Sequence, residues 1–207
     1  MNLANRLTVG RIVLTVFFVM ALLLPASGMV RQHVPFAKTV ALAIFVVAGL
    51  TDWLDGAMAR RRKEGTAFGA LLDPVADKIL VTAAFICFIE QKDYRGDALV
   101  QAWMVLVIVA RDFLVTGLRL VAGGQGVVLQ AERLGKHKTF WQMATIIVVL
   151  VGLAAREDWN CLGLERARFD TLFSVVTLWL MLATVALTLI SGIAYLYKNR
   201  ALLLRNV

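Results

Sequence analysis

The chain contains several long stretches without a charged residue, and the first of them runs from Ile12 to Val30. A helix needs about 20 apolar residues to cross the hydrocarbon core of a bilayer. The chain has 207 residues, 60% of them hydrophobic, whereas soluble domains average about 45–50%. This length is enough for about six spans with short connections. We therefore expect a single all-α integral membrane domain over residues 1–207.

The first uncharged stretch is longer than the core of a secretory signal, which has about 7–15 apolar residues, so we expect a retained helix. Lys and Arg are more numerous in the segments that share a side with the N-terminus, which favours an N-in, C-in orientation. The first span is expected within the uncharged residues 12–30, and Pro25 with the polar residues after it closes this span. The further expected spans are residues 36–59, 70–89, 99–119, 138–155 and 171–198.

Four aspartates gather around the connection between the second and third expected spans. Asp52 and Asp55 are three residues apart, and Asp73 and Asp77 are four apart, so on a helix each pair shares a face. Like charges so placed repel each other unless a cation lies among them. Mg²⁺ and Mn²⁺ prefer oxygen ligands and commonly bind carboxylates together with substrate phosphates. The spacing therefore indicates a divalent metal site.

The depth of Asp52 requires a polar cavity. The uncharged residues 39–51 that precede it cover only about 20 Å of a core near 30 Å thick, so Asp52 would lie below the membrane surface. Small residues and an arginine separate the two aspartate pairs. Small residues let another group approach the backbone, and an arginine offers a fork of donors to a phosphate. We expect a metal-dependent diphosphate site in a cavity open to the cytoplasm.

These residues fit the spacing D-x2-D-G-x2-A-R-x8-G-x3-D-x3-D, which resembles the signature of the CDP-alcohol phosphatidyltransferases, membrane enzymes of phospholipid synthesis. The resemblance implies that the four aspartates hold two Mg²⁺ or Mn²⁺ ions and that Asp77 also takes the acceptor's proton. The N-x-L-T-x-x-R entrance is similar as well. The implied contacts to the CDP moiety are Asn5, Thr8, Gly56, Ala59, Arg60 and Gly69.

A second basic region follows in the fourth and fifth expected spans. Arg111 and Asp112 form either a structural ion pair or part of a site, and Arg111 and Arg119 lie eight residues apart on one helical face. Lys136 and Lys138 either set topology or, with the arginines, bind a phosphate on the acceptor. The residues alone leave both alternatives open.

The segments R-D-F-L-V-T-G-L-R and G-K-H-K-T-F-W-Q-M resemble those of the bacterial phosphatidylglycerophosphate synthases, except that Asp112 replaces the usual glutamate. The resemblance implies transfer of a phosphatidyl group from CDP-diacylglycerol to sn-glycerol 3-phosphate, giving phosphatidylglycerophosphate and CMP. It implies an acceptor-phosphate site made by Arg111, Arg119, Lys136 and Lys138. It also implies a homodimer among the lipids of the bacterial inner (cytoplasmic) membrane, with the active site facing the cytoplasm.

Other functions are also compatible with parts of this sequence. A sibling enzyme would use inositol phosphate, serine or phosphatidylglycerol as the acceptor. A cation transporter is a different class, since carboxylates inside a membrane often mark ion paths, but polar groups would then lie at several depths. Nucleic-acid binding is not expected, because the basic residues are spread among the membrane-flanking loops. The last span, residues 171–198, indicates only membrane packing.

Overall fold

The structure is a computed structural model that describes residues 3–24, 36–59, 67–124, 133–159 and 165–204. Side chains are described for residues 9–24, 36–51, 78–124, 135, 137–159 and 165–200. In these ranges the secondary structure is helical, with one isolated β-bridge between Lys92 and Ala98. The helices are α1 (Leu3–Leu23), α2 (Ala37–Ala59), α3 (Ala67–Glu90), α4 (Ala102–Gly124), α5 (Arg133–Glu157) and α6 (Arg166–Leu204).

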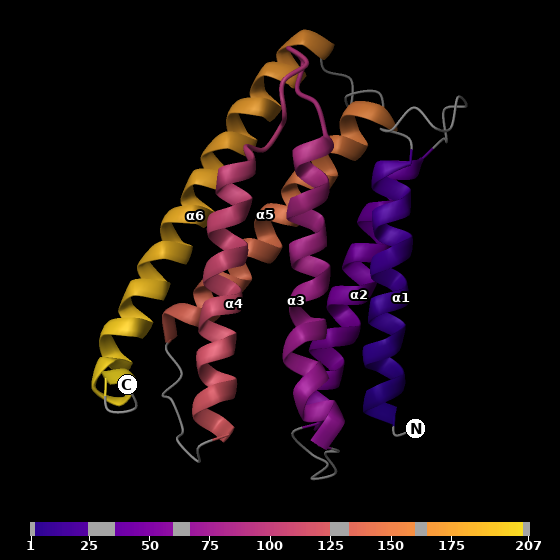
Figure 1. Ribbon diagram of the computed structural model, residues 1–207. Helices are drawn as coiled ribbons and strands as arrows, with labels where there is room; N and C mark the ends of the chain where they lie inside the picture. Colours follow the sequence, from indigo (N-terminus) through magenta and orange to yellow (C-terminus); the bar gives the residue numbers. More distant parts are fainter. Residues whose placement is uncertain (1–2, 25–35, 60–66, 125–132, 160–164, 205–207) are drawn as a thin grey trace.

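The helices run alternately up and down, so α1 begins and α6 ends at the same end of the bundle (Figure 1). Each of the six expected spans corresponds to one described helix. The first helix, α1, begins at Leu3, before the uncharged stretch, and ends at Leu23, close to Pro25, where the sequence predicts that the first span closes. α6 has 39 residues and is therefore about 58 Å long, nearly twice the roughly 30 Å thickness of a bilayer core.

Two described helical segments are long and apolar enough to cross a membrane, His137–Glu157 and Arg166–Arg200. Val9–Leu23 and Ala37–Thr51 are shorter apolar segments. Large apolar side chains also point outward; Leu106, for example, is 69% exposed. Soluble monomers rarely expose such surface in continuous patches. Length, composition and surface are thus those of a membrane protein, while the number of spans stays a prediction.

Aromatic rings fill the core between α1, α2 and α3. Phe18 and Phe45 are fully buried with their ring centroids 5.8 Å apart, and Phe85 meets Phe88 edge to face at 6.3 Å. Ile146 on α5 belongs to the same buried cluster. Burial of such rings stabilises the bundle through dense van der Waals contact. α5 packs against α2, α3 and α6, and α4 packs against α3 and α6.

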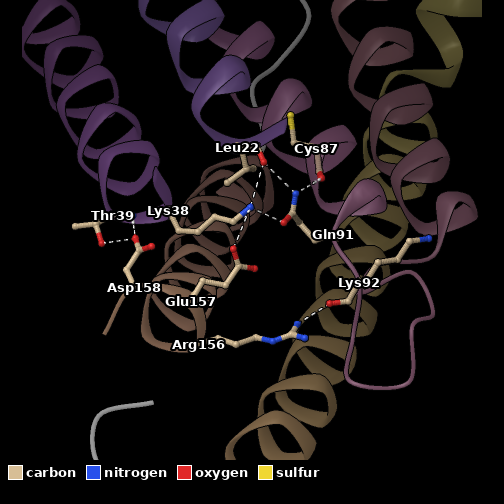
Figure 2. Close-up of polar contacts among 9 residues, drawn as sticks. All are labelled: Leu22, Lys38, Thr39, Cys87, Gln91, Lys92, Arg156, Glu157 and Asp158. Atoms are coloured by element: carbon tan, nitrogen blue, oxygen red, sulfur yellow. Dashed lines mark hydrogen bonds and ion pairs between the residues drawn. The ribbon is translucent and has the colours of Figure 1, made fainter. Parts of the chain in front are cut away.

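A largely buried polar cluster joins α1, α2, α5 and the residue that follows α3, at the end of the bundle opposite the N-terminus (Figures 1 and 2). Lys38 is 1% exposed, and its Nζ donates to the Leu22 carbonyl oxygen at 3.1 Å and to Gln91 Oε1 at 2.7 Å. Its ammonium also lies 3.7 Å from Glu157 Oε2. We call Leu22, Lys38, Gln91 and Glu157 the Lys38 cluster. Every partner in it is satisfied by another chain segment, so it fixes the helices to one another.

Candidate functional site

The four aspartates lie at two helix ends that face the same way. Asp52 and Asp55 are in the last two turns of α2, and Asp73 and Asp77 are in the first three turns of α3. Both helix ends lie at the end of the bundle where α1 begins (Figure 1). The helical backbone places each pair on one face, as the spacing predicted. The side chains of residues 52–77 are outside the described part, so metal ligation stays a prediction.

The residues expected near the CDP moiety lie around the same helix ends. Gly56 and Ala59 belong to the last turn of α2, and Gly69 belongs to the first turn of α3. Asn5 and Thr8 are in the first turns of α1, at the same end of the bundle. Arg60 lies outside the described residues. The backbone thus gathers the described members of this set at one end, and their contacts stay predictions.

Asp112 organises the second basic region. Asp112 is 6% exposed, and its carboxylate forms an ion pair with the Nζ of Lys138, a residue that is 4% exposed. A guanidinium nitrogen of Arg111 lies 3.3 Å from the same carboxylate oxygen, and Gln142 Nε2 donates to the other oxygen at 3.5 Å. We call Arg111, Asp112, Lys138 and Gln142 the Asp112 cluster. The ion pair considered from the sequence is present, and Lys138 extends it to a second helix.

Lys78 lies near the Asp112 cluster. It follows Asp77 directly on α3, and its charge acts on both Asp112 and Lys138. Helix α3, which carries Asp73 and Asp77, therefore also contributes a charged side chain to the surroundings of the Asp112 cluster.

Among the described side chains of the Asp112 cluster, two positive charges face one carboxylate. They belong to Arg111 and Lys138. An excess of positive charge in a largely buried setting is costly unless an anion is present. Within the described part of the chain, the buried Nε of Arg111 also has no hydrogen-bond partner. Such an arrangement is suited to binding a phosphate, and it carries no nucleophile of its own.

Arg111 and Arg119 both lie against α6. A ring contact brings the Arg119 guanidinium over the face of Tyr195, 5.2 Å from its centroid. The stem of Arg111 lies against the backbone at Gly192. Of the remaining predicted acceptor residues, Lys138 is in the Asp112 cluster, and Lys136 is on the first turn of α5 with a side chain outside the described set.

The polar face of α6 was not anticipated. Thr184, Thr188, Ser191, Tyr195 and Asn199 are all buried, and their spacings of four, three, four and four residues place them on one side of the helix. The Thr184 hydroxyl is 3.0 Å from the Thr145 hydroxyl of α5. A period of polar residues in an apolar helix was the available signal. The sequence interpretation of this segment as membrane packing alone missed it.

Comparison with known proteins places the chain among enzymes of one family. The model of the CDP-alcohol phosphatidyltransferase family matches residues 1–191. A Bacillus subtilis protein named CDP-diacylglycerol--glycerol-3-phosphate 3-phosphatidyltransferase is 38% identical over 202 residues, which cover 96% of this chain and 95% of that protein. Proteins with the same name from Yersinia enterocolitica and Haemophilus influenzae are 38% and 32% identical, over 87% and 100% of this chain and 91% and 97% of their own lengths. This chain therefore belongs to the CDP-alcohol phosphatidyltransferase family.

Proposed function

We propose that this protein transfers the phosphatidyl group of CDP-diacylglycerol to sn-glycerol 3-phosphate, giving phosphatidylglycerophosphate and CMP. The observation that carries the proposal is similarity over almost the whole chain to the Bacillus subtilis protein, whose name states this reaction. The buried positive charge around Asp112 supports it independently, because this acceptor bears a phosphate of its own.

The aspartates fit a pair of divalent ions. Asp52, Asp55, Asp73 and Asp77 supply hard carboxylate oxygens from two helix ends at one end of the bundle, the donor chemistry that Mg²⁺ and Mn²⁺ favour. When bound there, these ions polarise the diphosphate and neutralise charge on the departing CMP. Without cations, the four carboxylates would repel one another.

Asp77 accepts the proton of the acceptor's 1-hydroxyl group. The hydroxyl oxygen forms a bond to the phosphorus that carries the diacylglycerol, the bond from that phosphorus to the CMP oxygen breaks, and CMP leaves. A metal-bound carboxylate is a weak base, but the hydroxyl proton becomes acidic as its oxygen bonds to phosphorus. Gly56, Ala59 and Gly69 leave room for the cytidine diphosphate, Arg60 contacts its phosphates, and the helix start with Asn5 and Thr8 lies beside it.

The acceptor phosphate binds between α4 and α5. Arg111, Arg119, Lys136 and Lys138 supply the positive charge, and Asp112 holds Arg111 and Lys138 in place. The transfer requires this phosphate to lie near Asp77, and the electrostatic influence of Lys78, the next residue on α3, on Asp112 supports such a position. Serine, which lacks a phosphate, would leave the excess charge unpaired.

We further propose that six helices cross the bacterial inner membrane with both termini in the cytoplasm. The start of α1 and the end of α6 lie at the same end of the bundle, together with the aspartates, which supports this orientation (Figure 1). The soluble acceptor then reaches the site from the cytoplasm. A homodimer remains part of the proposal, resting on the family alone.

The test is CMP release by the protein purified in detergent. CDP-diacylglycerol would be supplied with Mg²⁺ or Mn²⁺, and sn-glycerol 3-phosphate, inositol phosphate, serine and phosphatidylglycerol would be offered separately. We expect release with glycerol 3-phosphate alone, and none after removal of divalent ions by EDTA. Release with another acceptor would overturn the acceptor assignment, and release in EDTA would overturn the metal site.

A further inference from the structure

The Arg119 guanidinium rests on a ring that is itself fixed. Tyr195 is 1% exposed, and the guanidinium carbon of Arg119 lies 5.2 Å from its ring centroid. A cation over an aromatic face is attracted by the electron-rich surface of the ring, also where the cation belongs to an exposed residue such as Arg119. The buried ring therefore gives a long, flexible side chain on α4 a defined direction.

The hydroxyl group of Tyr195 does not explain why this residue is buried. Its oxygen is buried and has no hydrogen-bond partner among the residues that the structure describes. Buried tyrosine hydroxyls usually find a partner, so an unpartnered one opposes folding slightly. The ring, rather than the hydroxyl, makes the contact with a functional side chain.

Gly192 provides the second contact between α6 and the arginines. A Cβ atom at this position would lie 3.0 Å from Arg111 Cγ and 3.4 Å from its Nε. The Arg111 side chain thus packs directly against the α6 backbone at Gly192. A side chain at position 192 would occupy the same space. Gly192 and Tyr195 are three residues apart and share one face of α6, and Arg111 and Arg119 share one face of α4. The two contacts are therefore parts of one interface.

We propose that Gly192 and Tyr195 are positioning residues for the acceptor phosphate. Their contacts orient the side chains of Arg111 and Arg119 so that both guanidinium groups can bind this phosphate. The inference rests on the proposed acceptor site. Both positions lie beyond residue 191, where the match to the family model ends. Holding the arginines before the substrate arrives lowers the entropy lost on binding, and so strengthens acceptor binding without touching the acceptor.

Substitutions at Tyr195 separate the ring from the hydroxyl. Tyr195→Leu should raise KM for sn-glycerol 3-phosphate about threefold to tenfold, with kcat and KM for CDP-diacylglycerol nearly unchanged. Tyr195→Phe keeps the ring and should behave like the unmodified protein. Tyr197→Leu is the matched control, because Tyr197 also stacks with an arginine, Arg200 at 3.8 Å, but is 67% exposed on the same helix. An equal effect of Tyr195→Phe and Tyr195→Leu would overturn the role of the ring.

Added bulk at Gly192 tests the other contact. Gly192→Val should displace Arg111 and raise KM for glycerol 3-phosphate, whereas Ile193→Phe adds volume on a side chain that is 67% exposed and should not. Equal KM values for the two variants would remove Gly192 from the proposal.

A double-mutant cycle distinguishes failure of this inference from failure of the acceptor site. If Tyr195 acts through Arg119, the variant Arg119→Gln/Tyr195→Leu should have the same KM as Arg119→Gln alone. An unchanged KM in Arg119→Gln would reject Arg119 as an acceptor residue. A raised KM in Arg119→Gln with additive effects in the double variant would reject the positioning role and leave the acceptor site intact.

Discussion

Asp112 of α4 and Lys138 of α5 form a buried ion pair between side chains 26 residues apart in the sequence. The pair gives a buried ammonium the counter-charge it needs, and Arg111 shares the same carboxylate. Helices that the sequence separates are thus joined at the place where the acceptor phosphate is proposed to bind.

Removal of the Asp112 charge should destabilise the protein. Asp112→Asn leaves Lys138 buried without a counter-ion, a change that typically costs about 3–5 kcal/mol of unfolding free energy. Asp112→Glu keeps the charge and should lose much less. Thermal unfolding in detergent measures both. The double variant Asp112→Asn/Lys138→Met should be more stable than Asp112→Asn, because it removes the orphaned charge; if it were less stable, the pair would not be the source of the loss.

Replacement of Asp77 should abolish turnover and preserve the fold. Asp77→Asn removes the residue proposed as both a metal ligand and the proton acceptor, so CMP release should fall by at least about 100-fold, as expected for loss of general-base catalysis. Asp93→Asn is the control, in the connection between α3 and α4 at the other end of the bundle (Figure 1). Activity and thermal unfolding would be measured on the same samples. Substantial CMP release by Asp77→Asn would remove Asp77 from the chemical step.

Neutralisation of Lys136 should weaken acceptor binding selectively. Lys136→Gln removes one positive charge from the proposed phosphate site, and we expect KM for glycerol 3-phosphate to rise about tenfold, equivalent to roughly 1.4 kcal/mol. Its neighbour His137 is exposed, and His137→Gln serves as the control. Steady-state kinetics with each substrate varied in turn would measure KM for both substrates in the two variants. An unchanged requirement for glycerol 3-phosphate would exclude Lys136 from the acceptor site.

The helices could be predicted because long uncharged stretches leave the backbone few alternatives in a membrane. The end of the first helix could be predicted near Pro25. A residue that precedes a proline disfavours the helical backbone conformation, and Leu24 precedes Pro25, so α1 ends at Leu23. The start of α1 at Leu3 was missed, because polar residues such as Asn5 are compatible with a helix end outside the apolar core.

The site could be predicted only where spacing carries the information. Aspartates three and four residues apart share a helical face whatever surrounds them. The partner of Lys138 could not be deduced in this way, since any of several acidic residues is compatible with its sequence position. Gly192 and Tyr195 gave no local signal, because glycine and tyrosine are common in membrane helices and only the packing of α6 on α4 reveals their neighbours.

The Lys38 cluster should support stability without affecting catalysis. Lys38→Met removes the ammonium shared by the Leu22 carbonyl oxygen, Gln91 and Glu157. Glu157 is exposed and Gln91 Nε2 still donates to the Leu22 carbonyl oxygen, so the main loss is at the buried Gln91 Oε1, and a buried group left unpaired costs about 1–3 kcal/mol. We therefore expect a lower unfolding temperature with KM for both substrates unchanged, because the cluster lies at the end of the bundle opposite the aspartates (Figures 1 and 2). Lys92→Met is the matched control, since Lys92 is exposed and Arg156 bonds only its carbonyl oxygen, at 2.6 Å. If Lys38→Met instead raised KM for glycerol 3-phosphate at temperatures where the variant stays folded, the two ends of the bundle would be coupled, and the Lys38 cluster could not be treated as purely structural.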